Sequence, residues 1–300
     1  MSSIIPHSRP WITKKDRLEV NKVLKSSMIS KGLLTKEFNN AVIKKIGAKY
    51  GILQATGTTA LVQALKALGI GRGDNVVIPT YVCRSVLDSV EFLGANPKIC
   101  DVNLNGVLDA DTVSSVIDDN TKAIIAVHIF GHFCDISSLR VFSVPIIEDA
   151  CQAFGLKNKG IFAGNMGDIG ILSFNATKCI TTAEGGMLLT NNQEYNFAGK
   201  EINDVSKISF DLNLAPLNDL QAALGLSQIK RFSEFSNRRK YLLGKFVKAS
   251  NDLGLDIQTD KESNLPFRFT IKSRTSFNDV KEKFESNGIM VRRGVDELLH

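Results

Sequence analysis

Three side chains that can do chemistry lie at the ends of apolar runs in the sequence. Asp149 ends the run SVPIIED, Ser173 lies in DIGILSF, and Lys178 follows in the next turn. Parallel α/β sheets gather their ligands at the carboxyl ends of their strands, so these positions are the first place to look for a site. A carboxylate, a hydroxyl and an amine could therefore meet at one edge of a sheet.

A fourth feature is the start of a helix in ATGTTALVQAL. Gly57, Thr58 and Thr59 open this helix, whose free backbone N–H groups and dipole can hold a phosphate. Each feature alone has a simpler interpretation. Gly-Thr-Thr often only caps a helix, Asp149 could cap the helix that follows it, and most lysines are solvated.

The combination points to pyridoxal phosphate. This cofactor needs an amine that forms a Schiff base with its aldehyde and an acid that keeps its ring nitrogen protonated. It also needs hydroxyl and N–H groups for its phosphate, which Thr58, Thr59 and Ser173 could supply. We therefore predict a pyridoxal phosphate site that contains Lys178 and Asp149.

The elements that must position these residues alternate along the first two thirds of the chain. Several short apolar runs are continuous, as in strands covered on both faces, and this pattern predicts an α/β protein with a parallel sheet. The expected helices are 16–25, 36–46 and 57–69, and the expected strands include 75–81, 97–102, 123–130, 144–149 and 168–174.

The composition of the sequence changes after Phe232, where charged residues become frequent. A charged helical stretch covers 233–250, and a strand (267–273), a helix (276–288) and a second strand (289–295) are expected after it. We predict a large domain over residues 1–232 and a small C-terminal domain over residues 233–300.

Composition excludes several classes of protein. The net charge of +6 comes from lysines and arginines spread along the chain without a nucleic-acid-binding motif, and an anionic small-molecule substrate explains a basic surface equally well. No apolar stretch has the length of a membrane span or a signal peptide, which predicts a cytoplasmic protein without a membrane partner. The five cysteines have no CxxC spacing and the four histidines form no metal-binding motif, so we expect no metal.

Seven segments in series resemble the DegT-type sugar aminotransferases, a family of fold-type I pyridoxal phosphate enzymes. The segments are HSRPWITKKD, ATGTTAL, GDNVVIPTYVCRSVLDSVEFLGANPKICDVN, AVHIFGHFCDI, IIEDACQAFG, GDIGILSFNATKCITTAEGG and LNDLQAALGLSQI. The resemblance runs from the N-terminus to about Lys230. It implies a three-layer α/β/α large domain with a mostly parallel sheet, and a small, shortened C-terminal α+β domain.

The resemblance also assigns roles to residues. Lys178 would carry the cofactor as an internal aldimine, Asp149 would pair with the ring nitrogen, and Gln152 would bond near the phenolic oxygen. Ser173, with Gly57, Thr58 and Thr59 at the helix start, would hold the phosphate. Family members place each site at a two-fold interface, which implies a homodimer with shared sites.

Two positions depart from the family pattern. Cys83 stands where the family has an aromatic ring on the cofactor, and Tyr81, two residues earlier, would share its face in a strand. The asparagine that reaches the partner's phosphate aligns with Leu214, so that the adjacent Asn213 is the candidate, with a turn residue as the alternative.

A third departure lies at the C-terminus, where the small domain is shorter than is usual in the family. Arg292 and Arg293 are candidates for binding a carboxylate or phosphate there. They could equally be exposed charges at a strand edge.

The implied reaction transfers an amino group, from glutamate, to a keto group of a nucleotide-linked sugar in amino-sugar or polysaccharide biosynthesis. Two alternatives remain open. One is another reaction on the same scaffold, such as a dehydration, although dehydratases of this family typically replace the lysine that is present here as Lys178. The other is a non-catalytic regulatory homologue. A nicotinamide-binding enzyme is disfavoured because no GxGxxG follows an early strand.

Overall fold

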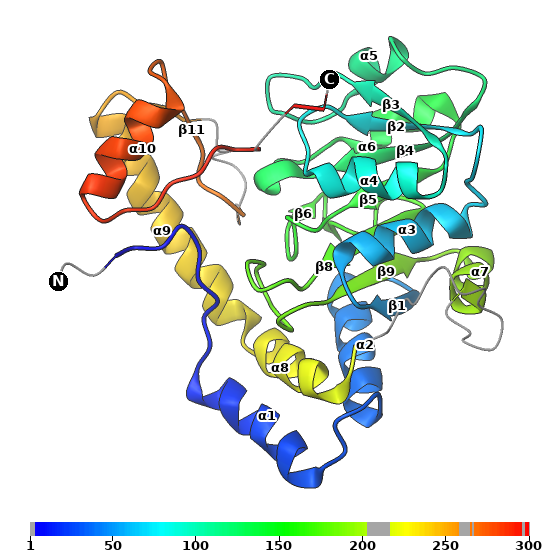
Figure 1. Ribbon diagram of the computed structural model, residues 1–300, viewed down its shortest axis with the longest axis horizontal. Coiled ribbons are helices and arrows are strands. Elements are labelled where there is room, and N and C mark those ends of the chain that lie inside the picture. The colour runs from blue at the N-terminus through cyan, green and yellow to red at the C-terminus, as the bar shows by residue number, and fades with distance from the viewer. Residues whose placement is uncertain (1–3, 203–216, 258–264, 266, 296–297, 300) are drawn as a thin grey trace.

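The computed structural model describes residues 4–202, 217–257, 265, 267–295 and 298–299 (Figure 1). The helices are α1 (Lys14–Ser26), α2 (Leu33–Ile46), α3 (Gly57–Ala67), α4 (Arg84–Phe92), α5 (Ala110–Ser114), α6 (Ile136–Leu139), α7 (Gln193–Ile202), α8 (Asp219–Lys230), α9 (Phe232–Asp252) and α10 (Phe277–Ser286). The strands are β1 (Tyr50–Gln54), β2 (Asn75–Pro79), β3 (Asn96–Cys100), β4 (Thr121–Val127), β5 (Ile146–Asp149), β6 (Lys157–Asn158), β7 (Ile161–Phe162), β8 (Ile169–Ser173), β9 (Gly186–Thr190), β10 (Asp256–Ile257) and β11 (Ile271–Lys272).

A seven-stranded sheet with the order β1-β9-β8-β5-β4-β2-β3 forms the centre of the molecule. Neighbouring strands from β3 to β8 run parallel, whereas β9 runs antiparallel to both β8 and β1. The predicted α/β class with a mostly parallel sheet is therefore confirmed. The sequence pattern did not reveal that β9 inserts antiparallel between β8 and β1.

Helices cover both faces of this sheet. Successive side chains of one strand point to opposite faces and so pack in two different cores. Leu188 of β9 packs in the core that contains residues of α3 and α4, and Leu189 packs in the core that contains residues of α2 and α8. Each residue is fully buried. Burial of such a side chain stabilises the fold by about 1.5–3 kcal/mol, so both layers of helices are held on the sheet by the hydrophobic effect.

The middle of helix α3 is buried on all sides, as its apolar sequence predicts. Its residues from Ala60 to Leu65 are all buried, and the side chain of Thr56 caps its first turn by accepting the Thr59 N–H at 3.0 Å. The chain leaves the helix through Gly69, whose φ of +74° is a conformation that glycine adopts without steric cost. A rigid helix start therefore lies against the sheet.

The C-terminal part begins at a break between two helices. Helix α8 ends at Lys230 and α9 starts at Phe232, so the predicted domain boundary coincides with this break. The small unit beyond α9 consists of the β10–β11 pair and α10, and the predicted helix over 276–288 is present. The division into two domains stays a prediction.

The predicted strand over 289–295 is wrong. Only Ile289 forms a bridge, with Ile5 of the N-terminal segment, and described residues further along contact the main sheet. There Gly294 lies against the Tyr81 hydroxyl, and the Leu299 N–H donates to Thr80 at 3.2 Å. The tail contacts the large body instead of pairing within the small unit.

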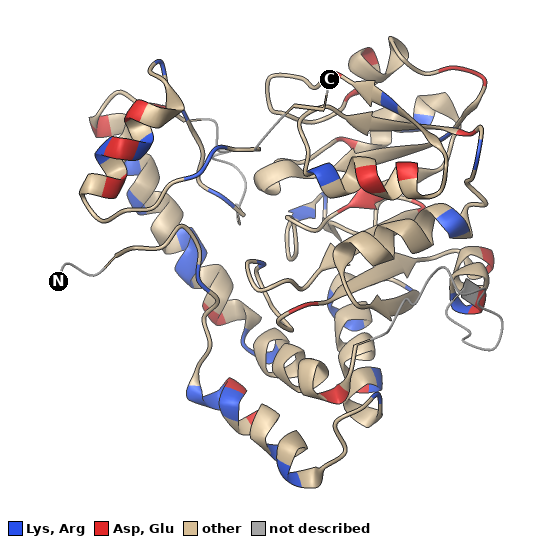
Figure 2. Cartoon of the chain, in the orientation of Figure 1, with Lys and Arg blue, Asp and Glu red and all other residues tan. Residues whose placement is uncertain are grey.

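No helix in the described ranges is long and apolar enough to cross a membrane. The same part of the chain holds no group of three or more histidine, cysteine or acidic residues that could bind a metal ion. Lysine and arginine are spread over many elements, including the C-terminal helices and the segments that join them to the sheet (Figure 2).

Candidate active site

Two neighbouring parallel strands carry the predicted acid and hydroxyl to the same edge of the sheet. Asp149 is the last residue of β5 and Ser173 the last of β8, and the register pairs Asp149 with Ile171. Both side chains are buried, each with an exposed fraction of 8%. Lys178 follows β8 in the next turn and is partly buried.

The start of α3 approaches these strand ends closely because residue 57 is glycine. A Cβ at Gly57 would lie 3.0 Å from the Ser173 Cβ and 3.2 Å from the Cys151 sulfur. A side chain here would therefore press on the strand ends and require them to shift slightly. Because glycine has no side chain, the positive end of the helix can lie close to the hydroxyl of Ser173, as an anion site requires.

The two threonines at the helix start have different surroundings. The Thr59 hydroxyl donates to the Thr56 carbonyl at 2.9 Å and accepts the Thr56 N–H at 3.0 Å, so it closes a capping box. Thr58 is exposed at the second helical position. Thr58 is therefore the more available of the two hydroxyls for a ligand.

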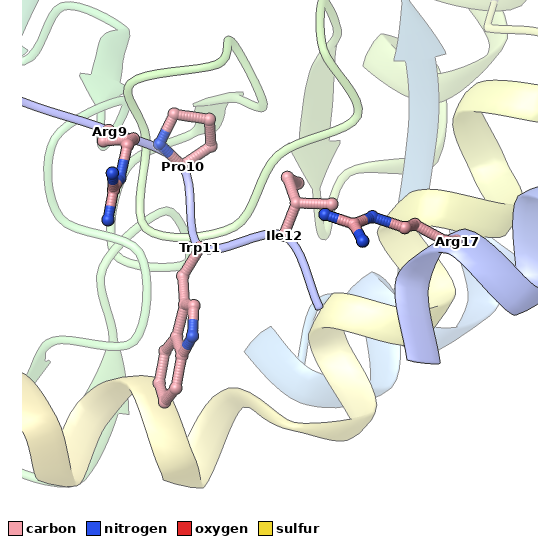
Figure 3. Close-up of a pocket in the computed structure, with 5 residues that line it drawn as sticks. All are labelled: Arg9, Pro10, Trp11, Ile12 and Arg17. Carbon is pink, nitrogen blue, oxygen red and sulfur yellow. The ribbon is translucent and has the colours of Figure 1, made fainter. Parts of the chain in front are cut away.

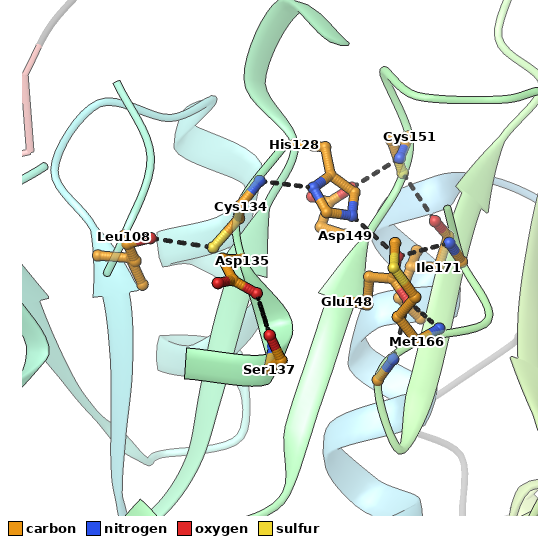
Figure 4. Close-up of polar contacts among 12 residues, drawn as sticks. Leu108, His128, Cys134, Asp135, Ser137, Glu148, Asp149, Cys151, Met166 and Ile171 are labelled. Atoms are coloured by element: carbon orange, nitrogen blue, oxygen red, sulfur yellow. Dashed lines mark hydrogen bonds and ion pairs between the residues drawn. The ribbon is translucent and has the colours of Figure 1, made fainter. Parts of the chain in front are cut away.

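Asp149 is oriented by its own backbone turn. The Cys151 N–H donates to the Asp149 carboxylate at 2.9 Å, as Figure 4 shows. Burial, and then the negative charge of Asp149, raise the pKa of the Cys151 thiol well above 9.0, whereas Lys178 acts to lower it. Asp149, Cys151 and Lys178 are thus close enough to interact electrostatically, and the thiol stays protonated.

A second buried network fixes the strands behind the site (Figure 4). Glu148 and His128 are fully buried and lie 2.8 Å apart, and the His128 Nδ1 accepts the Cys134 N–H, which assigns the ring proton to Nε2. Burial acts to raise the pKa of Glu148, but the bonds from His128, Gly164 and Gly167 outweigh it and lower the pKa. Sequence reasoning overlooked this network, although Glu148 directly precedes Asp149.

Gln152 connects the site to the C-terminal unit. Its Oε1 accepts the Phe130 N–H at 2.9 Å, and the Phe130 carbonyl accepts the N–H groups of Phe267 and Arg268 at 2.9 and 3.3 Å. The Phe267 ring lies under Lys178, whose Nζ is 5.1 Å from the ring centroid. Sequence reasoning missed Phe267 because only the folded chain brings it to the lysine.

Tyr81 and Cys83 lie in different surroundings. The Tyr81 ring meets Phe130 edge-on, with centroids 6.0 Å apart, and burial raises the pKa of Tyr81. Cys83 is exposed just before α4 and contributes to the electrostatic surroundings of Cys151. Which of the two faces the cofactor ring stays a prediction.

The remaining candidates are Asn213 and two arginines near the C-terminus. Asn213 falls outside the described residues. Arg292 and Arg293 are both exposed, and the Arg293 guanidinium lies 5.2 Å from the centroid of the Phe277 ring. Arg293 therefore contacts the start of α10.

A separate hollow of about 400 Å³ lies along the N-terminal segment (Figure 3). In the figure the Trp11 side chain points toward α8 and α9, and Trp11 meets Phe235 edge-on at 5.3 Å. The hollow is lined by Arg9, Pro10, Trp11, Ile12 and Arg17. It contains none of the residues predicted for the site, so the chemistry is placed at the strand ends instead.

The residues at the strand ends fit pyridoxal phosphate. They provide a partly buried amine in Lys178, a buried carboxylate in Asp149 and a buried hydroxyl in Ser173. The space that a Cβ at Gly57 would fill lies at the start of a helix, where a phosphate is stabilised by free N–H groups. This combination matches the donor set that the cofactor needs.

Comparisons with known proteins identify the family of the chain. Residues 10–293 match the DegT/DnrJ/EryC1/StrS aminotransferase family. The chain is 32% identical over 277 residues to GDP-perosamine synthase of Escherichia coli O157:H7, covering 86% of this chain and 74% of that protein. It is 31% identical over 270 residues to the spore coat polysaccharide biosynthesis protein SpsC of Bacillus subtilis (strain 168), covering 82% and 69%.

The fold also matches solved structures. The structure of DesI in the presence of its TDP-sugar product aligns with a TM-score of 0.89 at 22% identity, covering 99% of this chain and 80% of that chain. At this identity the match concerns the fold.

Proposed function

The chain belongs to the DegT/DnrJ/EryC1/StrS aminotransferase family, and from this membership we propose that it uses pyridoxal phosphate to aminate a keto group of a nucleotide-linked sugar. The observation that carries the proposal is the meeting of Lys178, Asp149 and Ser173 at one edge of the sheet, beside the glycine that opens α3. Glutamate is the proposed amino donor.

Each residue has a proposed task. The Lys178 amine holds the cofactor covalently through its aldehyde, and later moves a proton at the carbon that carries the amino group. The buried Asp149 carboxylate, fixed by the Cys151 N–H, holds a proton on the ring nitrogen. When bound, pyridoxal phosphate supplies an electron-withdrawing ring that stabilises negative charge on the substrate carbon.

The phosphate is proposed to bind where α3 meets β8. Gly57 and Thr58 supply backbone N–H groups at the helix start, Thr58 also supplies its exposed hydroxyl, and Ser173 supplies a second hydroxyl. Thr59 contributes chiefly through its backbone and its cap. Gln152 accepts the Phe130 N–H and so orients the loop that carries Phe130. We propose that Gln152 also bonds near the phenolic oxygen of the cofactor.

The substrate class is supported by what the relatives are named for. One relative is a synthase of a GDP-linked amino sugar, and another acts in the synthesis of a spore coat polysaccharide. We propose a role in amino-sugar or polysaccharide biosynthesis for this chain, in the cytoplasm. The presence of Lys178 favours transamination over dehydration on this scaffold.

Borohydride trapping of the cofactor tests the proposal. Borohydride should fix pyridoxal phosphate on the wild-type chain at a peptide containing Lys178, as mass spectrometry of a digest would show. Lys178→Ala should abolish both the trapped adduct and transamination, whereas Lys240→Ala, which removes an exposed lysine of α9, should change neither. A trapped adduct that persists in Lys178→Ala would sink the assignment.

We also propose a homodimer with shared sites. Exposed apolar side chains gather between α1 and α2, where Met28, Ile29 and Leu33 have exposed fractions of 74%, 48% and 67%. Such a surface suits burial against a second copy. Light scattering at micromolar concentration should give twice the chain mass, and a fully active monomer would contradict the proposal.

Asn213 is proposed to reach the partner's phosphate site. Mixed dimers can test this, provided that a chain with a bulky charged substitution at Asn213 is inactive, folded and dimeric. Combining such chains with Lys178→Ala chains should restore partial activity, because one site of each mixed dimer then carries neither defect.

A further inference from the structure

Three cationic side chains surround one phenyl ring next to the candidate active site. The Lys178 amine, the Arg239 guanidinium and the Arg268 guanidinium lie 5.1, 6.0 and 4.2 Å from the centroid of the Phe267 ring. Each is within the range of a cation–π contact. The separation of Lys178 from Arg268 cannot exceed the sum of their two distances to the ring, so Arg268 lies close to the catalytic lysine.

Two more basic groups face Arg268 from other parts of the chain. Burial, followed by the charge of Arg239, lowers the pKa of Arg268 to about 10. Cys179 acts in the opposite direction, and Arg292 adds a smaller lowering effect. Burial, followed by Arg268 and Arg292, also lowers the pKa of His7. Arg239 of α9 and Arg292 of the C-terminal tail therefore concentrate positive charge around Arg268, and His7 of the N-terminal segment adds an imidazole that can form a hydrogen bond.

Three of these basic side chains form no close ion pair with a carboxylate in the part of the chain that the structure describes. The close ion pairs there join other bases, for example Arg231 with Asp16, Lys98 with Asp118 and Arg140 with Asp168. Lys178, Arg268 and Arg292 form none with a described carboxylate. Neighbouring cations that are not paired with carboxylates repel one another, and an anion that binds between them relieves this repulsion.

The backbone holds the cluster in place before any ligand arrives. The N–H groups of Phe267 and Arg268 both donate to the Phe130 carbonyl, and the Arg239 Nη1 donates to the Phe267 carbonyl at 3.1 Å. Phe267 itself is 5% exposed and packs in a core of the large body. A preorganised cluster loses little conformational entropy on binding, which raises its affinity.

We propose that Arg268, with Arg292 and His7, binds the diphosphate of a nucleotide-linked sugar and thereby sets the sugar ring between this cluster and Lys178. The assignment rests on the proposed function and gives it a substrate contact. A diphosphate with several negative oxygens matches a cluster of several cations, whereas an amino-donor carboxylate is satisfied by a single guanidinium. The N-terminal and C-terminal segments of one chain then build the nucleotide side of the site.

Calorimetry of nucleoside diphosphates tests the assignment on the full chain with its cofactor bound. UDP, GDP and dTDP would be titrated singly, with inorganic pyrophosphate as a competitor. Arg268→Gln should weaken the affinity for the bound nucleotide by about tenfold to one hundredfold, the size expected for loss of a charged hydrogen bond. Arg268→Lys should retain part of the affinity because lysine keeps the positive charge. It should not retain all of it, since lysine cannot donate the two parallel hydrogen bonds of a guanidinium.

Matched variants make the result specific. Arg238→Gln removes an exposed neighbour on α9 that lies 5.3 Å from the Tyr241 ring, and should leave nucleotide affinity unchanged. Arg292→Gln removes an exposed member of the cluster and should lower affinity less than Arg268→Gln. Arg292→Gln also provides an independent test if Arg268→Gln shows no cooperative thermal unfolding and is therefore not folded.

The outcomes separate this proposal from the proposed function. Equal nucleotide affinity in wild type and Arg268→Gln, or no nucleotide binding by wild type, would overturn the diphosphate site. If Arg268→Gln raises the KM for the amino donor and leaves nucleotide affinity unchanged, Arg268 binds the donor carboxylate, and the diphosphate site is overturned as well. In each case, borohydride trapping at Lys178 reports on the proposed function independently.

Discussion

The sheet and the C-terminal unit are stabilised in different ways. The residues of β5 and β8 are all buried, and the side chains of β9 pack in the hydrophobic cores on both faces of the sheet. In contrast, α10 has no buried residue, and β10 and β11 contribute two residues each. Leu265 and Phe267 instead insert into a core of the large body. The sheet can thus fix reacting groups by its own packing, whereas the groups on the C-terminal unit depend on a few docking contacts.

The largest expected effect comes from the sheet side of this comparison. Asp149→Asn should leave cofactor affinity nearly unchanged but slow single-turnover proton transfer by roughly 10²- to 10⁴-fold, since an amide cannot hold the ring proton as a carboxylate does. Stopped-flow absorbance with glutamate would measure the rate, with Asp119→Asn as an exposed control. A near-normal rate with bound cofactor would remove Asp149 from its role.

The next effect should separate the two regions. Phe267→Ala removes a buried ring and should cost about 3–5 kcal/mol at the docking contact. We expect faster amide hydrogen exchange in α10 and residues 267–272, with protection of β5 and β8 retained. Phe246→Ala is the control, because that ring is 48% exposed and stacks on Phe269 within the C-terminal part. Equal loss of protection in β5 would show that the regions unfold together and would contradict the two-domain division.

A smaller effect is expected where α1 packs on α8. Asp16 is 1% exposed and accepts bonds from Thr13, Ser227 and Arg231, which outweigh burial and lower the pKa of Asp16 below 3.8. Asp16→Asn should lower the free energy of unfolding by about 2–3 kcal/mol at pH 7, because Arg231 loses a buried partner.

The pH dependence gives a second check of that contact. A carboxyl with a lowered folded pKa stabilises the protein above its unfolded pKa, and this contribution is lost as pH falls through the folded value. The difference between wild type and Asp16→Asn should therefore persist at pH 5 and shrink below pH 3.8 in urea titrations. The exposed Asp252→Asn serves as control, and a pH-independent difference would contradict the charge argument.

The sequence predicted much of the sheet and little of the C-terminal unit, for a physical reason. Continuous apolar runs such as 144–149 identify strands because burial on both faces dictates their composition. The direction of β9 depends on its neighbours β8 and β1, which no local pattern of GMLLT reveals. The run 289–295 looked like a strand, but Ile289 bridges to Ile5 and the rest contacts the large body.

The site shows the same division. Asp149, Ser173 and Lys178 could be selected because polar residues after buried strands stand out against their apolar neighbours. Phe267 and Arg268 are separated from Lys178 by many residues, and their position is set by bonds to Phe130. Tertiary contacts of this kind leave no periodic signal in the chain.

Phe130 gives the docking contact a built-in strain. This buried residue has a φ of +55°, which costs a non-glycine residue about 1–2 kcal/mol, and its peptide groups bond to Gln152, Phe267 and Arg268. The hydrogen bonds that these peptide groups make offset that cost. One residue in a costly conformation thus joins the loop after β4 to the C-terminal unit.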